Sequence, residues 1–424
     1  MNRIVNVFDN GLRVVLNQTE KTKPVSIMFG VNTGSVNESQ ENNGVSHFIE
    51  HMVFKGTTGR TAQDISKDLE GIGANANAFT SKFHTCFYAT CMIDEVEKCF
   101  EILSDMFFDP LFSQEDIDKE RKVIFEEIDM YEDDPGSVAY DDFTKNFFLG
   151  TKVEKSVIGT KESLKNINRE QIVEYKNQFY TAPNIVITVS GGLEENEFLT
   201  LIKKYALNKL PETKFLAKEV DYDKDTILLP EQKFNFIKKN IAQTHIVMGF
   251  PAKTIYSDDR MAYTLLSFIV GGGMSSRLFI KIREELGLVY GIHCLPDLYD
   301  CGGTVSISLA TNHSQQKMAV KTIKEELEKL IKEGVTQEEL DRAKIFCKTL
   351  IVTSSETSTN TTRHSTSDML IYNKIRTVEE KLESIQKVTL EQINKLIRES
   401  FSFKNMCASV VSDKIDETIF DCFC

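Results

Sequence analysis

The sequence predicts an α+β fold built from two similar halves. A chain of 424 residues is longer than one ordinary hydrophobic core supports, so at least two domains are expected. The apolar segment Ile27–Val31 resembles Ile246–Phe250, which lies 219 positions further along the chain. Each half runs from strands through helices to a closing strand, expected at Ile185–Val189 and at Ala408–Val411. This repeated order of elements is typical of an internal duplication.

Turn and capping residues place several elements of the two halves. Residues 5–16 alternate around an Asp-Asn-Gly turn at residues 9–11, which predicts a β-hairpin. A helix should begin after Ser113, whose hydroxyl can cap it, and should end before Pro135. The second half has a matching helix that begins after Thr336, again with an acid three residues on.

The boundary between the halves is expected in a charged, weakly periodic stretch. Residues 208–232 contain Pro211 and Pro230 and have the composition of a linker. We therefore expect an N-terminal domain at 1–210, a linker at 211–232 and a C-terminal domain at 233–424.

Composition narrows the class of protein. A net charge of −13 argues against binding of nucleic acid, which requires a basic face. We find no apolar N-terminal run typical of a signal peptide, and no stretch approaching the roughly 20 apolar residues of a membrane span. Nine cysteines without C-x-x-C pairs indicate reduced thiols, and the Cys422-Phe-Cys424 tail fits no prenylation pattern. We expect a cytoplasmic protein.

The most informative motif is His47-Phe-Ile-Glu50-His51. Histidines four residues apart lie on one face of a helix, so both imidazoles can bind one Zn²⁺ at about 2.0–2.1 Å. Glu50 faces the same side and is placed to take a proton from an attacking water. This H-x-x-E-H order is the reverse of the commoner H-E-x-x-H motif. The alternative is a helix with two ordinary histidines.

A third metal ligand should come from the helix that begins after Ser113. Glu120 and Glu127 lie at the edge of its apolar face, whereas Glu126 points to solvent. An unpaired carboxylate on an apolar face is costly, and a metal or a histidine would supply its partner. The alternative is that both acids pair with lysines. The apolar face itself consists of Ile117, Ile124, Ile128 and Tyr131.

With this motif and the segment Lys119–Ile128, the chain resembles the pitrilysin superfamily of inverted zinc metallopeptidases, and within it the mitochondrial-processing-peptidase-like branch. The resemblance implies two homologous sandwich-like domains, each a mainly antiparallel sheet flanked by helices. It also implies one zinc per chain, bound by His47, His51 and Glu127. Glu50 would be the general base, and Glu120 would support the site.

The second half lacks the metal residues, because the positions equivalent to the two histidines are Leu266 and Val270. In the resembled family an Arg and a Tyr seven residues apart contact the substrate, and Arg283 and Tyr290 match this spacing. The alternative is a surface arginine and a core tyrosine. The preceding segment 271–278 is rich in glycine but lacks the phosphate-loop pattern.

The small residues of Gly73–Thr80 would let an extended peptide approach a sheet edge and pair with it as an added strand. By the resemblance, Asn77, Ala78 and Phe79 belong to this substrate-binding edge. Phe83 departs from the family pattern, where relatives usually carry an acid.

We therefore expect a zinc metalloendopeptidase that cleaves peptides or unfolded, presequence-like segments. Because the chain carries only two domains, the resemblance implies a homodimer in which Arg283 and Tyr290 act on the zinc site of the other subunit. One alternative is a catalytically silent scaffold subunit, which the intact zinc residues argue against. A second is a peptide-binding partner without hydrolysis, which only an activity assay separates.

Overall fold

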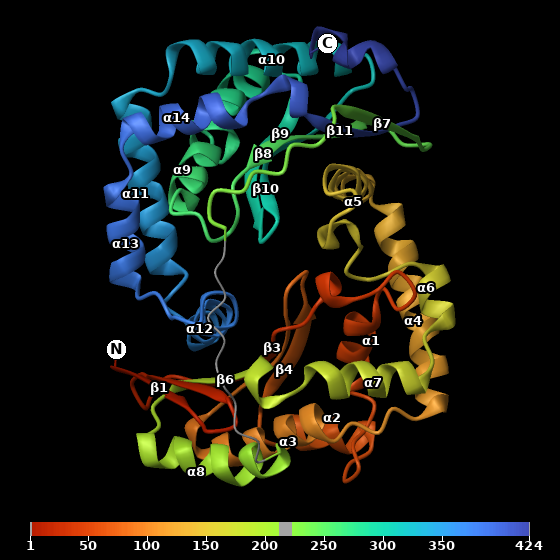
Figure 1. Cartoon of the computed structure of the whole chain (residues 1–424), viewed down its shortest axis with the longest axis vertical. Helices are drawn as coiled ribbons and strands as arrows, with labels where there is room; N and C mark the ends of the chain where they lie inside the picture. Colours follow the sequence, from red (N-terminus) through yellow and green to blue (C-terminus); the bar gives the residue numbers. More distant parts are fainter. Residues whose placement is uncertain (1, 212–222, 424) are drawn as a thin grey trace. The chain divides into compact units, whose positions relative to one another are not determined.

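The computed structural model describes residues 2–211 and 223–423 of the chain. These residues form two compact units (Figure 1). The first unit draws on Met1–Ile128, Lys155–Glu219 and Val352–Thr377, and the second on Asp129–Glu154, Val220–Ile351 and Val378–Cys424. No helix of the described ranges is long and apolar enough to cross a membrane.

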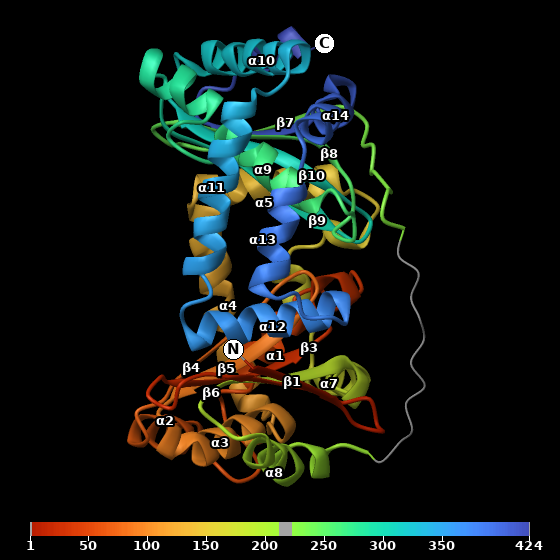
Figure 2. The same ribbon diagram turned by 90° about the vertical axis from the view of Figure 1, so that its left-hand side faces the viewer.

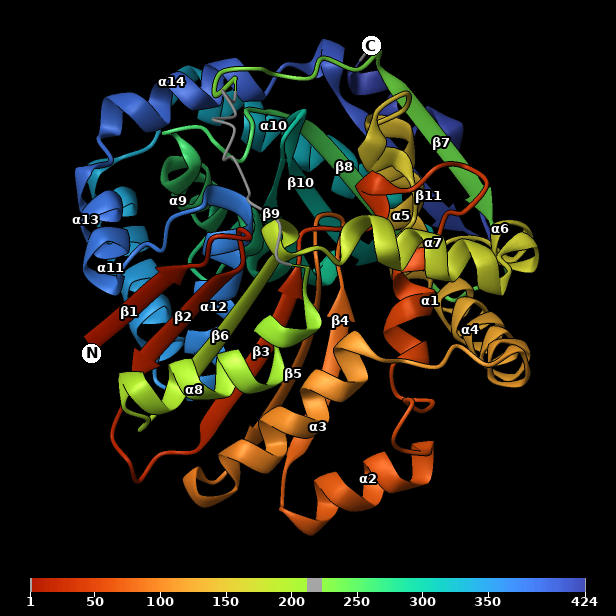
Figure 3. The ribbon, with the colours of Figure 1, turned by 60° about the horizontal axis from the view of Figure 1, so that its bottom comes forward.

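The first unit is built on a six-stranded sheet in the order β1-β2-β6-β3-β5-β4 (Figure 3). Only β2 and β6 pair in parallel among these neighbours; the other pairs are antiparallel. The strands are β1 (Asn2–Val7), β2 (Arg13–Gln18), β3 (Val25–Val31), β4 (Asn75–Thr80), β5 (Thr85–Cys91) and β6 (Ile185–Gly191). The helices are α1 (Val45–Met52), α2 (Ala62–Gly71), α3 (Val96–Phe108), α4 (Gln114–Asp133), α6 (Lys161–Asn166), α7 (Arg169–Phe179), α8 (Glu195–Tyr205) and α12 (Ser358–Tyr372), with the unit boundary falling inside α4.

The second unit is built on a five-stranded sheet in the order β7-β11-β8-β10-β9. Its strands are β7 (Lys233–Lys238), β8 (Thr244–Ala252), β9 (Val289–Tyr299), β10 (Gly302–Thr311) and β11 (Cys407–Ser412). Its helices are α5 (Pro135–Phe147), α9 (Arg260–Gly271), α10 (Gln316–Glu333), α11 (Gln337–Thr353), α13 (Val378–Lys387) and α14 (Leu390–Ser400), together with a π-helix at Phe279–Glu285.

The two sheets confirm the internal duplication. Taken in chain order, the five strands of the second sheet lie in the same spatial order as β2 to β6 of the first, with only the β2/β6 and β7/β11 pairs parallel. The segments Ile27–Val31 and Ile246–Phe250 fall on the equivalent strands β3 and β8. The expected hairpin is the antiparallel pair β1–β2. The fold class is therefore as predicted, two mainly antiparallel sheets flanked by helices.

The compact units differ from the contiguous domains 1–210 and 233–424 that the sequence suggested. Helix α12 of the C-terminal half packs on β3 and β6 of the first unit, and α5 of the N-terminal half packs on β8 and β11 of the second. Figure 2 shows α12 on one face of the first sheet, with α3 and α8 on the other. Half of the expected linker, at 212–222, lies outside the described residues.

Helix α12 meets its sheet through hydroxyl groups as well as apolar side chains. Thr362 donates to Ser190 Oγ (2.7 Å), and Thr366 donates to Thr188 Oγ1 (2.8 Å). Because each sheet has two apolar faces to cover, a second helix layer is required. A helix rich in Ser and Thr looks polar on every side, so its sequence does not show which sheet it covers.

Candidate metal centre

Helix α1 carries the H-x-x-E-H motif, and a buried acid from the preceding loop binds its N-terminus. Gly44 precedes the helix with φ 95°, a conformation that favours glycine. The carboxylate of Glu38 accepts hydrogen bonds from the backbone N–H groups of Gly44 (2.7 Å) and Ser46 (2.9 Å). These N–H groups have no partner inside the helix, so the bonds to Glu38 satisfy them. Glu38 therefore caps the start of α1.

The apolar face of α1 packs into the core and leaves the motif on the opposite side. Residues spaced three and four apart share this face, as expected for an amphipathic helix. They are Val45, Phe48, Ile49 and Met52. His47, Glu50 and His51 are consequently gathered toward α4 and β4.

Helix α4 contributes two of its acids to the same place. Oε2 of Glu127 lies 3.3 Å from Nε2 of His51 and 3.7 Å from Nε2 of His47. Oε1 of Glu120 lies 2.9 Å from Nδ1 of His51. Ser113 begins α4 as expected, since its hydroxyl accepts from the N–H of Asp116 (3.1 Å). The structure thus brings together the four residues that the sequence placed at the metal.

The donor set of this site fits a divalent metal. One ligand atom from each of His47, His51 and Glu127 lies within 4.8 Å of the others. Two tetrahedral ligands at zinc distances are about 3.3 Å apart, close to the separations found here. Glu120 at the far nitrogen of His51 would orient the ring, as carboxylates do for metal-bound histidines. His47 Nδ1 is buried without a hydrogen-bond partner among the described residues.

The residues of the cluster shift one another's pKa values. Burial alone would lower the pKa of His51, but hydrogen bonds to Glu120 and Glu127 raise it to about 9. The hydrogen bond from His51 in turn lowers the pKa of Glu127. Burial and the neighbouring His51 lower the pKa of His47 to about 4, so this ring is neutral at pH 7. His47 and Glu127 are thus in the forms that bind metals, whereas His51 must release a proton when a metal binds.

Glu50 does not pair with the histidines but with the edge strand. Thr80 of β4 donates its hydroxyl to Oε2 of Glu50 (2.5 Å). Burial raises the pKa of Glu50, while the bond from Thr80 works against this. A carboxylate whose pKa is moved upward toward neutrality is suited to general acid–base chemistry.

The sequence did not predict two polar contacts of this centre, Lys55 with Glu120 and Thr80 with Glu50. Nζ of Lys55 lies 2.7 Å from Oε2 of Glu120, whose pKa is lowered by His51 and Lys55 despite its burial. Neither contact has a sequence signal, because each joins residues of different elements.

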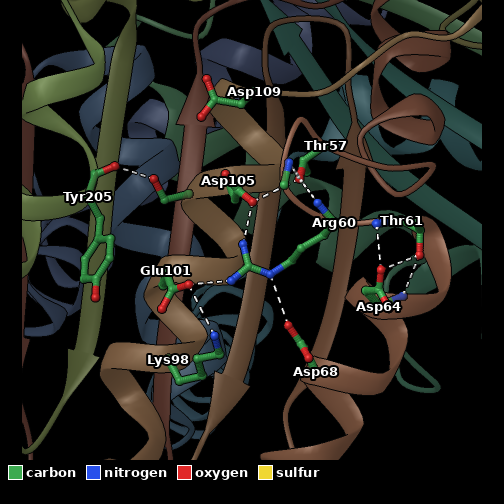
Figure 4. A network of polar contacts seen from close by, with 12 residues as sticks. Thr57, Arg60, Thr61, Asp64, Asp68, Lys98, Glu101, Asp105, Asp109 and Tyr205 are labelled. Carbon is green, nitrogen blue, oxygen red and sulfur yellow. Dashed lines mark hydrogen bonds and ion pairs between the residues drawn. The ribbon is translucent and has the colours of Figure 1, made fainter.

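The loop that carries Lys55 is held to α2 and α3 by Arg60 (Figure 4). The Arg60 guanidinium donates to Asp68 of α2 (3.1 Å) and to Glu101 and Asp105 of α3. Thr57 of the loop also donates to Asp105 (3.0 Å). These contacts fix the chain just beyond the metal helix, so that Lys55 is presented to Glu120.

The expected substrate-binding residues lie on a free sheet edge. Strand β4 pairs with β5 on one side and is the last strand of its sheet. Asn77 is exposed, Ala78 packs against the core under the sheet, and Phe79 packs on the opposite face. Phe83 lies in the turn that joins β4 to β5. The edge runs beside the metal helix, since β4 contacts α1.

Arg283 and Tyr290 lie together in the second unit. The guanidinium carbon of Arg283 lies 4.6 Å from the ring centre of Phe279 and 5.4 Å from that of Tyr290. Tyr290 is 88% exposed, which excludes the alternative of a core tyrosine. Leu266 and Val270 are buried in α9, so the helix equivalent to α1 serves the core of its own unit.

The glycine-rich segment 271–278 has a structural use. Arg277 makes a bidentate ion pair with Glu339 (2.6 and 2.8 Å) and donates to the carbonyl of Gly334 (2.8 Å). Glu339 also caps α11 by accepting from the N–H of Thr336 (2.8 Å). Arg277 is therefore engaged at a helix N-terminus, and the weak phosphate interpretation gains no support.

The comparisons with known proteins agree with this site. The family model described as insulinase (peptidase family M16) matches residues 13–161, and the model described as the peptidase M16 inactive domain matches residues 166–346. An uncharacterized zinc protease of Bacillus subtilis is 31% identical over 395 residues, covering 93% of this chain and 94% of its own. The chain belongs to peptidase family M16, the insulinase or pitrilysin family.

Further relatives extend this likeness. An uncharacterized zinc protease of Mycobacterium leprae is 31% identical and covers 91% of this chain and 86% of its own. In fold, the chain is similar to a protease from Helicobacter pylori (TM-score 0.86, 20% identity, 97% and 99% covered). A peptidase M16 inactive domain from Pseudomonas fluorescens gives a TM-score of 0.88 at 19% identity, with 98% of each chain covered. The metal of this site is zinc, by the names of the relatives and the donor set.

Proposed function

We propose that the chain is a zinc-dependent endopeptidase that hydrolyses peptides and unfolded or presequence-like segments. The observation that carries the proposal is the gathering of His47, His51 and Glu127 within 4.8 Å, next to a buried Glu50. We also propose that it belongs to the mitochondrial-processing-peptidase-like branch, with one zinc per chain and His47, His51 and Glu127 as ligands.

Zinc, when bound by these three residues, would supply Lewis acidity that activates water and polarises the scissile carbonyl. Glu50 accepts the proton of the attacking water, and its raised pKa lets it hold that proton and return it to the leaving amine. Thr80 holds the Glu50 carboxylate through a hydrogen bond of 2.5 Å. Glu120 and Lys55 keep the His51 ring in its orientation.

The substrate would bind as an added strand along β4. An edge strand offers unpaired backbone groups, and Ala78 allows close approach. Asn77 would donate to the peptide backbone and Phe79 would contact a side chain. Strand addition needs an extended backbone, so peptides and unfolded segments are the substrate class.

The complete active site would form in a homodimer. Arg283 of one subunit would donate hydrogen bonds to the peptide backbone at the zinc of the other, and Tyr290 would stabilise the oxyanion. The free thiols of Cys86, Cys91 and Cys99 support our placement of the protein in the reducing cytoplasm.

The proposal is tested with a mixed peptide library and mass spectrometry. The purified zinc protein should cleave internal peptide bonds, chelation should abolish cleavage, and stoichiometric zinc should restore it. Cleavage that is unchanged after complete removal of zinc would overturn the proposal. A protein that binds peptides and zinc without cleaving would support the alternative of a peptide-binding subunit.

A further inference from the structure

The edge strand β4 presents two faces of different chemistry. Ala76 and Ala78 pack against the core under the sheet, on the side where Thr80 contacts Glu50. Phe79 packs on the opposite face, with the cluster that includes Met369 of α12. A peptide that pairs with β4 alternates its side chains in the same way, so every second side chain would point to the α12 face.

An arginine of α12 lies at this outer face of the edge. Thr359 of α12 is within hydrogen-bond distance of Thr90 of β5 (3.1 Å), which places this side of α12 over β5. One turn later, the guanidinium carbon of Arg363 lies 4.3 Å from the ring centre of Phe79 on β4. Arg363 is exposed, and it has no ion pair or hydrogen bond to any residue in the described ranges.

A guanidinium that lies over an aromatic ring keeps its N–H donors free, because they point outward in the plane of the guanidinium group. Those donors fit a carboxylate in bidentate geometry. His84, whose ring centre lies 5.9 Å from that of Phe79, adds no second cation, because burial and Arg363 lower its pKa to about 4. The outer face of β4 thus offers one unpaired cation that is held in place by Phe79.

We propose that Arg363 is a specificity-determining residue, which binds an acidic side chain of the peptide at the single position opposite Phe79. The inference rests on the proposed strand addition at β4 and names the substrate class of that site. The side chains directly before and after the acidic one would point to the opposite face of β4, where Thr80 contacts Glu50, and would not contact Arg363. A charge preference should therefore appear at one position only, and not at the positions directly before and after it.

The test uses peptide sets in which a single Glu is exchanged for Gln at each position in turn. The ratio of kcat/KM for the Glu and Gln peptides is measured for the wild type, Arg363→Gln and Arg363→Glu. An exposed charge pair predicts a preference for Glu of about 2- to 5-fold at one position of the wild type. This ratio should fall to about 1 in Arg363→Gln and should invert in favour of the Gln peptide in Arg363→Glu. Arg342→Gln, a surface arginine of α11, is the matched control and should keep the wild-type ratio.

Binding separates this inference from the proposed function. The same peptides are titrated against the Glu50→Gln chain with and without Arg363→Gln, because this background retains the β4 edge without the general base. A preference for Glu that depends on Arg363 supports the inference even where no peptide is cleaved. Equal affinities for the Glu and Gln peptides, or a preference that survives Arg363→Gln in a folded chain, would overturn it whether or not hydrolysis occurs.

Discussion

Two neighbouring glutamates of α4 have opposite surroundings. Glu127 reaches both histidines of the motif, whereas Glu126 is exposed. This pair gives a matched test of the proposed ligand set, because both side chains have the same length and lie on the same helix.

Glu127→Gln should lower the zinc content of purified protein from about one per chain to a small fraction, since a neutral amide is a poor zinc ligand. Glu126→Gln should keep the full content. Metal analysis after dialysis against limited zinc gives both values. Equal loss in the two variants would show that the wrong carboxylate has been assigned.

The residues of the candidate metal centre could be predicted because their positions follow helix periodicity. Helix periodicity predicts that histidines four residues apart on α1 share one face. It also predicts that two acids of α4 lie at the edge of its apolar face, where they can face the same site. The partners Lys55 and Thr80 could not be predicted, because their hydrogen bonds cross between elements. Glu38 was missed for the same reason, although it caps the metal helix from six residues before Gly44.

At the scale of elements, the ion pair between Arg277 and Glu339 joins the glycine-rich segment to the start of α11. Arg277 and the backbone of Thr336 outweigh the effect of burial and lower the pKa of Glu339 to about 2. Since the folded pKa lies below the unfolded value of about 4.5, this group stabilises the fold above pH 4.5. Its contribution is lost as the pH falls from about 4.5 to about 2.

Glu339→Gln should therefore lower the stability of the second unit at pH 7 by about 1–3 kcal/mol. The difference from the wild type should shrink as the pH falls through this window, as followed by thermal melts across the pH range. Glu338→Gln, which removes an exposed neighbour paired with Arg342, is the control and should change little. A constant deficit of Glu339→Gln down to pH 2 would refute the assigned role.

Helices α5 and α12 each pack on the sheet of the other half of the chain, and this packing could not be predicted from the sequence. Their existence follows from capping and propensity, for example from Asp134 and Pro135 at the start of α5. The sheets on which they pack could not be predicted, because a helix face that is rich in hydroxyl groups or mixed in polarity does not indicate its partner. The sequence offset predicted the duplication, but contacts between distant segments decide which sheet each helix completes.

At the scale of the whole molecule, the dimer hypothesis predicts complementation between inactive chains. Glu50→Gln and Tyr290→Phe should each be strongly impaired, the second by roughly 10²- to 10³-fold. After subunit exchange, half of the dimers are mixed, and each has one complete site, so activity should recover to about one quarter of the wild-type value. No recovery despite demonstrated exchange, or full activity of a strict monomer, would sink the hypothesis.

The central claim is that this chain hydrolyses peptides with Glu50 as the general base beside a zinc ion. The most direct measurement compares wild type and Glu50→Gln at equal, measured zinc content on the same peptide. Glutamine has the same shape but cannot accept the proton, so turnover should fall by about 10²- to 10⁴-fold while zinc remains bound. Near-normal turnover by Glu50→Gln with its zinc in place would contradict the account.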